Sequence, residues 1–239
     1  DDPRYEDQWY LHKISAAQAW DITMGSADAK VCVADSGFDV GHEDQPANLV
    51  LSLDYVAGGN VQSDPHGHGT HVTGIIAART NNGKGIASLA PGVQVVSMRV
   101  LDELNIGYDW QFAEALYHGA TTEGCRVINL SLGGPMPSQT FKAAVDYAIA
   151  QGVLVVAASG NCGVVSPACP IANPPSYPAM YPGVMAVGAT DANDQHAEFS
   201  NYGGYISVVA PGVDVLSTLP RSNVDPPYNW WDGTSMAAP

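Results

Sequence analysis

Residues 126–158, RVINLSLGGPMPSQTFKAAVDYAIAQGVLVVAA, decide the fold of this chain. Two apolar runs, 126–132 and 153–158, predict strands, and Gly-Gly-Pro ends the first. Between them, residues 138–151 carry apolar side chains at helical spacing behind Ser138, a candidate N-cap. Strands that are apolar throughout and separated by a helix are typical of a parallel sheet covered on both faces.

The same alternation continues on both sides of this unit. Further strands are predicted over residues 30–34, 93–101, 184–189 and 206–210, and a further helix over 110–124. The Pro-rich segments 163–178 and 220–229 are predicted to be surface loops. We find no internal repeat and no linker. The sequence therefore predicts one α/β domain over residues 1–239, with a central, mostly parallel β-sheet and helices on both faces.

Composition excludes several classes of protein. The 239 residues are 46% hydrophobic and 14% charged, which allows a packed core and excludes a disordered chain. The net charge is −15, and the scattered Lys and Arg form no basic patch. A nucleic-acid partner and an anionic membrane surface are therefore not expected. No apolar run approaches the ~18 residues that a membrane-spanning helix needs.

Four cysteines allow three fully paired connectivities. Cys162 and Cys169 lie close together around a Pro-containing segment, so we predict a local disulfide there, with two free thiols as the alternative. Cys32 lies within an apolar run and is expected to be a buried free thiol. Few charges and a disulfide indicate an extracytoplasmic protein.

Polar residues follow several of the predicted strands. Asp35 follows the first strand, Ser131 ends the run of 126–132, and Asn161 follows the run of 153–158. In open α/β sheets, ligands bind outside the carboxyl ends of the strands, so we expect these side chains to meet. Taken singly, each has an ordinary interpretation as a turn residue or a helix cap.

Four segments taken together have a more specific meaning. They are VADSG (33–37), HGHGTH (66–71), ASGN (158–161) and GTSMAAP (233–239). In this order, and with Gly beside each polar residue, they resemble the subtilases, the subtilisin-like serine proteases. The resemblance covers nearly the whole chain and includes AQAWD (17–21), VINLSLGG (127–134), YPA (177–179) and APG (210–212). It implies a subtilisin-like fold and a serine endopeptidase with an Asp, His, Ser triad, whose chain order is that of subtilisin.

The resemblance assigns roles residue by residue. Ser235 is the expected nucleophile, and a serine hydroxyl needs an adjacent base. His68 is that base, and it later donates the proton to the leaving amine. Asp35 holds the His68 tautomer and stabilises the imidazolium. Asn161 donates its amide to the oxyanion beside the Ser235 backbone N–H.

The expected substrate contacts lie on three segments. Ser131, Leu132 and Gly133 resemble the family's substrate-binding strand, and Asn105 to Gly107 its opposing edge, so an extended polypeptide would pair between them. Ala158, Ser159 and Gly160 are expected to form the wall of the specificity pocket. Because nothing charged lies between residues 159 and 175, we expect a neutral pocket for large apolar or aromatic P1 side chains. Tyr108 resembles a residue of a more distant substrate pocket, with a plain surface or core Tyr as the alternative.

Calcium is the cofactor that the resemblance implies. This ion prefers carboxylate and carbonyl oxygens. The matching positions are Asp2, Asp44, Arg79, Asn82, Lys84 and Ile86. A second site near Asp54 is not expected, because residues 57–59 bring no carboxylate.

The resemblance also implies a secreted monomer with an upstream signal and an inhibitory propeptide as a partner. Only four residues follow Ser235, so we expect the chain to be a piece of a longer protein. Two other classes compete. His66, His68 and His71 could ligate zinc, with His71 otherwise starting the helix that carries His68. A non-catalytic binding domain could share the fold. A serine-directed fluorophosphonate and a zinc chelator separate these classes.

Overall fold

The structure is a computed structural model that describes residues 1–61 and 63–239. The helices are α1 (Trp9–Lys13), α2 (Ala16–Trp20), α3 (His68–Ala77), α4 (Asp109–His118), α5 (Gln139–Ala150) and α6 (Thr234–Ala237), with a 3-10 turn at Tyr5–Asp7 and a π-helical turn at Gly119–Glu123. The strands are β1 (Lys30–Asp35), β2 (Leu49–Asp54), β3 (Gln94–Arg99), β4 (Val127–Leu130), β5 (Leu154–Ala158), β6 (Met185–Thr190), β7 (Val208–Pro211), β8 (Val215–Thr218) and β9 (Tyr228–Trp231).

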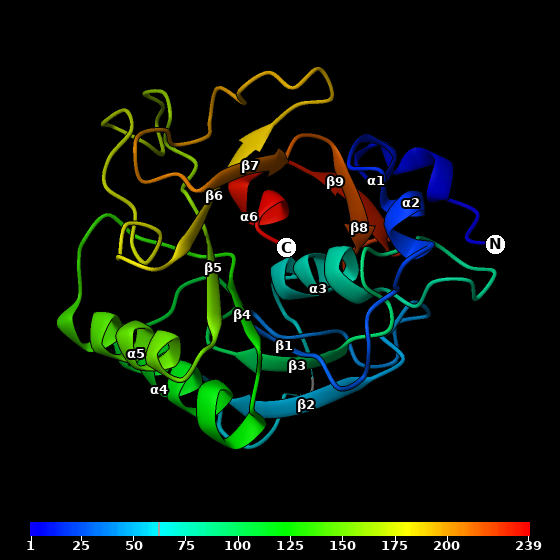
Figure 1. Ribbon diagram of the computed structural model, residues 1–239, viewed down its shortest axis with the longest axis horizontal. Helices are drawn as coiled ribbons and strands as arrows, with labels where there is room; N and C mark the ends of the chain where they lie inside the picture. Colours follow the sequence, from blue (N-terminus) through cyan, green and yellow to red (C-terminus); the bar gives the residue numbers. More distant parts are fainter. Residues whose placement is uncertain (62) are drawn as a thin grey trace.

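A seven-stranded sheet forms the centre of the molecule (Figure 1). Its strand order is β2-β3-β1-β4-β5-β6-β7, and every neighbouring pair is parallel. The predicted α/β fold with a mostly parallel sheet is confirmed. Residues 126–158 contain β4, α5 and β5, and Ser138 caps α5 by accepting a hydrogen bond from the Phe141 N–H.

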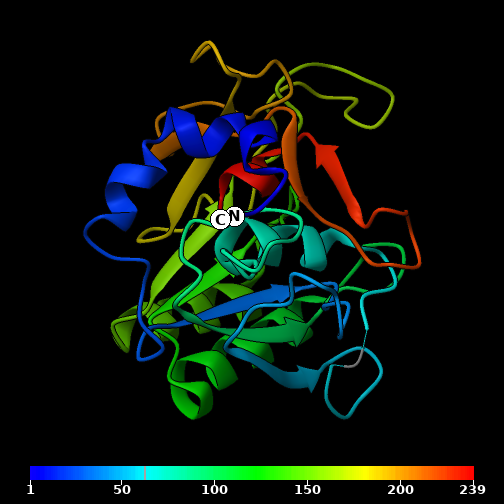
Figure 2. The same ribbon diagram turned by 90° about the vertical axis from the view of Figure 1, so that its right-hand side faces the viewer.

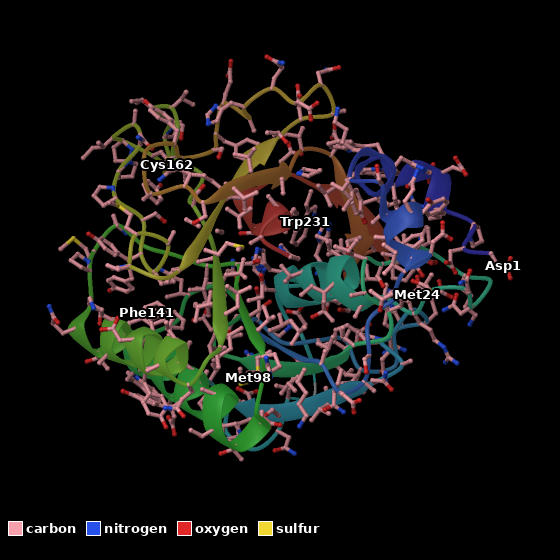
Figure 3. The ribbon with its side chains drawn as sticks, in the orientation of Figure 1. Asp1, Met24, Met98, Phe141, Cys162 and Trp231 are labelled. Carbon is pink, nitrogen blue, oxygen red and sulfur yellow. A yellow bond between two sulfur atoms is a disulfide. The ribbon has the colours of Figure 1, made fainter. Side chains whose placement is uncertain are left out.

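Helices cover both faces of the sheet, as Figures 1 and 2 show. On one face, α4 and α5 pack against buried strand residues, and Figure 3 labels Phe141 of α5 and Met98 of β3 in this layer. On the other face, α3 and α6 pack with α1 against the sheet. Cys32 and Val33 lie in these two separate clusters, because successive residues of a strand point to opposite faces.

An antiparallel hairpin of β8 and β9 lies against α3. The hydroxyl of Ser217 donates to the His71 carbonyl (2.7 Å), and that of Thr218 donates to the Thr70 carbonyl (2.8 Å). Gly74 permits this approach, because a Cβ there would collide with both hydroxyls. The hairpin therefore fixes the helix that begins at His68.

The structure corrects two predictions about elements. The helix carrying His68 begins at His68 itself, after Gly67 in a left-handed conformation (φ 101°), so His71 lies inside the helix and does not start it. The segment 220–229, predicted as loop, ends in the first residues of β9. In the described part of the chain, no helix has the length and apolar character needed to cross a membrane.

Candidate active site

Three neighbouring strands bring the polar residues together. β1 ends at Asp35, β4 leads into Ser131 and β5 leads into Ser159, and these strands are adjacent in the sheet. The expectation that side chains at the carboxyl ends of these strands meet is supported by this arrangement. α3 and α6 begin at the same edge, which places His68 and Ser235 there.

Asp35 and His68 form a buried pair. Asp35 Oδ1 lies 2.8 Å from His68 Nδ1, and the two residues are 1% and 7% exposed. Asp35 Oδ1 also accepts a hydrogen bond from the Ser36 backbone N–H (2.7 Å). A hydrogen bond to Nδ1 selects the tautomer that leaves Nε2 free to take a proton.

Glycine at position 69 makes this pair possible. A Cβ at Gly69 would collide with the Gly37 carbonyl oxygen and lie 3.2 Å from the Asp35 Cβ. The first turn of α3 therefore approaches the Asp35 loop as closely as backbone allows.

The environment of His68 favours its protonated form. Burial alone would lower the pKa of His68, but the charge of Asp35, its hydrogen bond and the charge of Asp64 outweigh burial and raise this pKa above its ordinary value. His71 behaves oppositely, because burial and the charge of His68 lower its pKa to about 3. The pKa values of the two imidazoles are therefore shifted in opposite directions.

Ser235 is the second residue of α6. Its hydroxyl donates to the Ser131 carbonyl (3.0 Å), while the Ser131 hydroxyl donates to the Ser235 carbonyl (2.8 Å). In the described residues the Ser235 hydroxyl bonds to Ser131 and makes no hydrogen bond to His68. Catalytic hydrogen bonds commonly tighten only when substrate is bound.

Asn161 is oriented by its neighbour in α6. Its Oδ1 accepts from the Thr234 backbone N–H (2.9 Å) and from the Thr234 hydroxyl (2.8 Å). The amide Nδ2 is thereby turned the other way, and it lies 3.5 Å from where a Cβ on Gly233 would stand. The Ser235 N–H lies in the first turn of α6, where N–H groups have no partner within the helix. Asn161 Nδ2 and the Ser235 N–H are therefore two donors left for another acceptor.

A cleft of about 760 Å³ lies beside Ser235 and Asn161, and neither Asp35 nor His68 is among its described lining residues. Its lining includes Ser235 and Asn161 together with most of the predicted substrate-binding residues, namely Ser131, Leu132, Gly133, Asn105, Gly107, Ala158 and Gly160. Two predicted residues are not part of the lining. Ser159 is fully buried, and its hydroxyl points to the Asn201 carbonyl, while Tyr108 is 65% exposed and precedes α4. Asp109 is the one charged residue among the described lining residues.

Cys162 and Cys169 form the predicted disulfide, and both line the cleft. Figure 3 labels Cys162 in the loop that follows β5. The prediction for Cys32 is wrong in part: the residue is fully buried, as expected, but it is bonded to Cys125. An apolar run predicts burial without saying what the sulfur contacts, and Cys125 lies 93 residues away in sequence.

The predicted calcium-binding residues gather at one place. Asp2 accepts hydrogen bonds from the N–H groups of Asn81 and Asn82 (2.9 and 3.2 Å), which belong to the loop between α3 and β3. Asp44, 1% exposed, accepts from the Asn82 amide (2.8 Å) and the Ile86 N–H (2.9 Å). The two carboxylates therefore hold the same loop.

Two observations bear on whether these residues suit a cation. Within residues 1–61 and 63–239, neither Asp2 nor Asp44 forms a salt bridge with a basic side chain. Over the same residues, the carbonyl oxygens of Arg79, Lys84 and Ile86 accept no hydrogen bond. Buried carboxylates without a basic partner beside unpaired carbonyl oxygens are the donor set that Ca²⁺ prefers. The residues present fit this ion.

Two histidines of the HGHGTH segment have separate hydrogen-bond partners. His68 contacts Asp35, and His71 Nε2 lies 3.2 Å from the Asn229 carbonyl. His71 also stacks on Trp231 (4.8 Å between ring centroids), which Figure 3 labels beside α6. In the described chain no group of three His, Cys, Asp or Glu side chains is arranged to hold a metal ion.

Asp64 is a residue that sequence reasoning missed. It is 3% exposed and contacts the segments that carry Asp35 and His68. Its position just before the HGHGTH segment could have identified it. An acidic residue next to Pro65 is, however, also typical of an ordinary loop.

Comparison with known proteins identifies the family of this chain. The model of the subtilase family matches residues 26–239. Thermitase of Thermoactinomyces vulgaris is 40% identical over 239 residues, covering all of this chain and 81% of that protein. Subtilisin Savinase of Lederbergia lenta is 42% identical over 231 residues, covering 97% of this chain and 80% of that protein.

A third relative is longer. The thermophilic serine proteinase of Bacillus sp. (strain AK1) is 42% identical over 221 residues, covering 92% of this chain. The aligned region spans about half, 52%, of that protein. The chain belongs to the subtilase family, a family of serine endopeptidases with the subtilisin-like α/β fold.

Proposed function

We propose that this protein hydrolyses peptide bonds through Ser235, His68 and Asp35. The observation that carries the proposal is the buried contact of Asp35 with His68 Nδ1, at the strand ends where Ser235 and Asn161 also lie. His68 Nε2 takes the Ser235 hydroxyl proton as Oγ attacks the substrate carbonyl carbon. The carbonyl oxygen becomes an oxyanion bound by the Asn161 amide and the Ser235 N–H.

The remaining steps restore the enzyme. The imidazolium of His68 donates its proton to the leaving amine as the peptide bond breaks, and an acyl ester on Ser235 remains. Water then attacks this ester with His68 again as the base, which releases the acid and returns the proton to Ser235. Asp35 stabilises the imidazolium in both halves without becoming protonated itself.

The substrate that we propose is an extended polypeptide. Residues 131–133 and 105–107 all line the cleft, which supports a substrate strand lying between the two segments. The pocket wall contains Ala158 and Gly160, so it offers room and no charge, and we propose a preference for large apolar or aromatic P1 residues. Peptides that differ only in P1 test this: kcat/KM should be at least about tenfold higher for Phe than for Glu or Lys. Equal values would contradict it.

We also propose a calcium ion held by Asp2, Asp44 and Asn82 side chains with the carbonyl oxygens of Arg79, Lys84 and Ile86. The resemblance to subtilases and the donor set described above support this. When bound, the ion would neutralise two carboxylates and tie the N-terminal segment to the loop between α3 and β3. The two disulfides support an extracellular location, and we propose a secreted monomer whose partners are polypeptide substrates and its own propeptide.

The direct test is hydrolysis of a peptide with Phe at P1 by the protein and by Ser235→Ala. The variant should lose at least about 10³-fold in kcat, because no other hydroxyl replaces the nucleophile. Ser207 is an exposed serine directly before β7, so Ser207→Ala is the matched control and should retain full activity. Unchanged activity in Ser235→Ala would contradict the proposal.

A further inference from the structure

Asp64 is a buried carboxylate beside the triad that the mechanism above does not use. Its Oδ1 accepts hydrogen bonds from the Ser36 hydroxyl (2.8 Å) and the Gly67 N–H (2.7 Å). Its Oδ2 accepts from both the N–H and the hydroxyl of Thr70 (2.7 Å each). All four bonds come from N–H or O–H donors, so both carboxylate oxygens of Asp64 act as acceptors. In the described residues, Asp64 has no salt bridge to Lys or Arg.

These bonds join the two segments that carry the triad's acid and base. Gly67 is the N-cap of α3 and Thr70 is its third residue, so Asp64 caps the helix that begins at His68. Ser36 directly follows Asp35, and its hydroxyl oxygen also accepts from the Gly69 N–H (2.9 Å). One carboxylate therefore ties the first turn of α3 to the loop after β1.

We infer that Asp64 is a positioning residue for His68. It holds the first turn of α3 so that the imidazole stays on Asp35, and its negative charge favours the imidazolium that forms in the reaction. The inference rests on the proposed function only in naming His68 as the general base.

The charged and titratable groups around His68 come from three elements. Asp35 comes from β1, Asp64 and His66 from the loop before α3, and His71 from α3 itself. From β9 the facing side chain is Trp231, which carries no charge. Burial lowers the pKa of His68, whereas Asp35 and Asp64 raise it.

Two further charged residues, on the loop after β1 and on the loop between β8 and β9, form an ion pair and neutralise each other. Arg221, between β8 and β9, pairs with Asp39 after β1, with 2.8 Å between Nε and Oδ2. His71 stays uncharged near neutral pH, because its pKa lies at about 3. Asp64 is therefore the second source of unneutralised negative charge at His68, after Asp35.

The first experiment reads His68 without turnover. NMR titration of the imidazole, assigned with His68→Gln, is carried out on Ser235→Ala and on Ser235→Ala with Asp64→Asn. Asparagine keeps the size of the side chain but removes the charge and one acceptor, so the pKa of His68 should fall. An unchanged pKa of His68 would overturn the charge role of Asp64.

The second experiment uses the active protein. Asp64→Asn should lower kcat about tenfold with little change in KM, and the acid limb of kcat/KM should move to lower pH. Asp64→Glu restores the charge, so the acid limb should return while kcat recovers only in part. Asp191→Asn, which removes a carboxylate that caps a distant turn, should change neither quantity.

A merely structural role gives a different pattern. If Asp64→Asn lowers only the melting temperature, with kcat and the acid limb unchanged, the inference is wrong. If this variant does not fold, Ser36→Ala takes its place: it keeps the Asp64 charge but removes the bridging hydroxyl, so kcat should fall with the acid limb unmoved. An unchanged kcat in Ser36→Ala would also overturn the inference. Failure of Ser235→Ala to abolish hydrolysis would contradict the proposed function alone.

Discussion

The imidazole of His68 sets the pH dependence expected of this protein. The base must be neutral to take the Ser235 proton, and Asp35 and Asp64 raise the pKa of His68 above its ordinary value of 6.5. Activity should therefore fall as the pH decreases through this raised pKa, and the acid limb of kcat/KM should lie above pH 6.5.

The acid limb of kcat/KM should reflect the titration of a single proton, because the pKa of His71 is far lower, at about 3. A pH profile of kcat/KM from pH 5 to 9 measures it. Asp35→Asn is the control: it should lower kcat by about 10⁴ because the tautomer is lost. An acid limb below pH 6.5, or one that reflects two protons, would contradict this account of His68.

In the proposed mechanism, Asn161 acts through one side-chain nitrogen. Thr234 occupies its Oδ1, so Nδ2 is the atom available to an oxyanion. Asn161→Ala should lower kcat by about 10²–10³ with KM nearly unchanged, the loss typical of a side-chain donor in a subtilisin oxyanion hole. Steady-state kinetics on a P1 Phe peptide measure both constants.

The matched control is Asn193→Ala, an exposed amide in the turn after β6, which should leave both constants unchanged. A rise in KM with constant kcat in Asn161→Ala would instead mean that Asn161 binds the ground state.

The two disulfides serve different elements. Cys162–Cys169 closes a short loop at the cleft, and Cys32–Cys125 ties β1 to the segment before β4 across 93 residues. By chain entropy, the short loop contributes about 2–3 kcal/mol to the free energy of unfolding and the long one about 4–5 kcal/mol.

Replacing each cysteine pair by serine tests this contrast. The Cys162/Cys169 variant should change kcat/KM and P1 preference, because the pocket rim loosens, with a small fall in melting temperature. The Cys32/Cys125 variant should lower the melting temperature more, by about 8–20 °C, with unchanged kinetics. Identical kinetics in the first variant would contradict the role assigned to the rim.

The sequence predicted those helices and strands whose formation depends on a local pattern of apolar residues. The apolar runs of the central strands and the helical spacing of α4 and α5 were sufficient to place them. The β8–β9 hairpin was missed because Pro-rich residues join its strands and its contacts are hydroxyls on α3 carbonyls, which leave no periodic trace. Tyr108 and Ser159 do not line the cleft as predicted. A match to a family motif predicts where the backbone lies, but not where the side chain points.

At the scale of the whole molecule, the residues of the proposed calcium site join distant parts of the chain. Tyr228 of β9 donates its hydroxyl to Asp44 (2.9 Å), and the Arg4 N–H donates to the Gly85 carbonyl (2.8 Å). The N-terminal segment, the loop after α3 and the hairpin that leads to Ser235 therefore meet around Asp2 and Asp44. Most of the net charge of −15 lies elsewhere on the surface.

Removing Ca²⁺ should accordingly destabilise the whole fold. At a hundredfold excess over Kd, the bound ion contributes about 2.7 kcal/mol. Dialysis against a chelator should lower the melting temperature by about 5–10 °C, and added Ca²⁺ should restore it. Asp44→Asn should abolish this response, whereas Asp191→Asn should retain it. A melting temperature indifferent to chelator would contradict the proposed site.

The central claim is that Ser235 is a nucleophile activated by His68. Its most direct test is reaction with a fluorophosphonate probe, followed by digestion and mass spectrometry of the labelled peptide. The account predicts one label per chain, on Ser235, with labelling slowed at least about 10³-fold in His68→Ala. Label on a different residue, or equal labelling in His68→Ala, would contradict it.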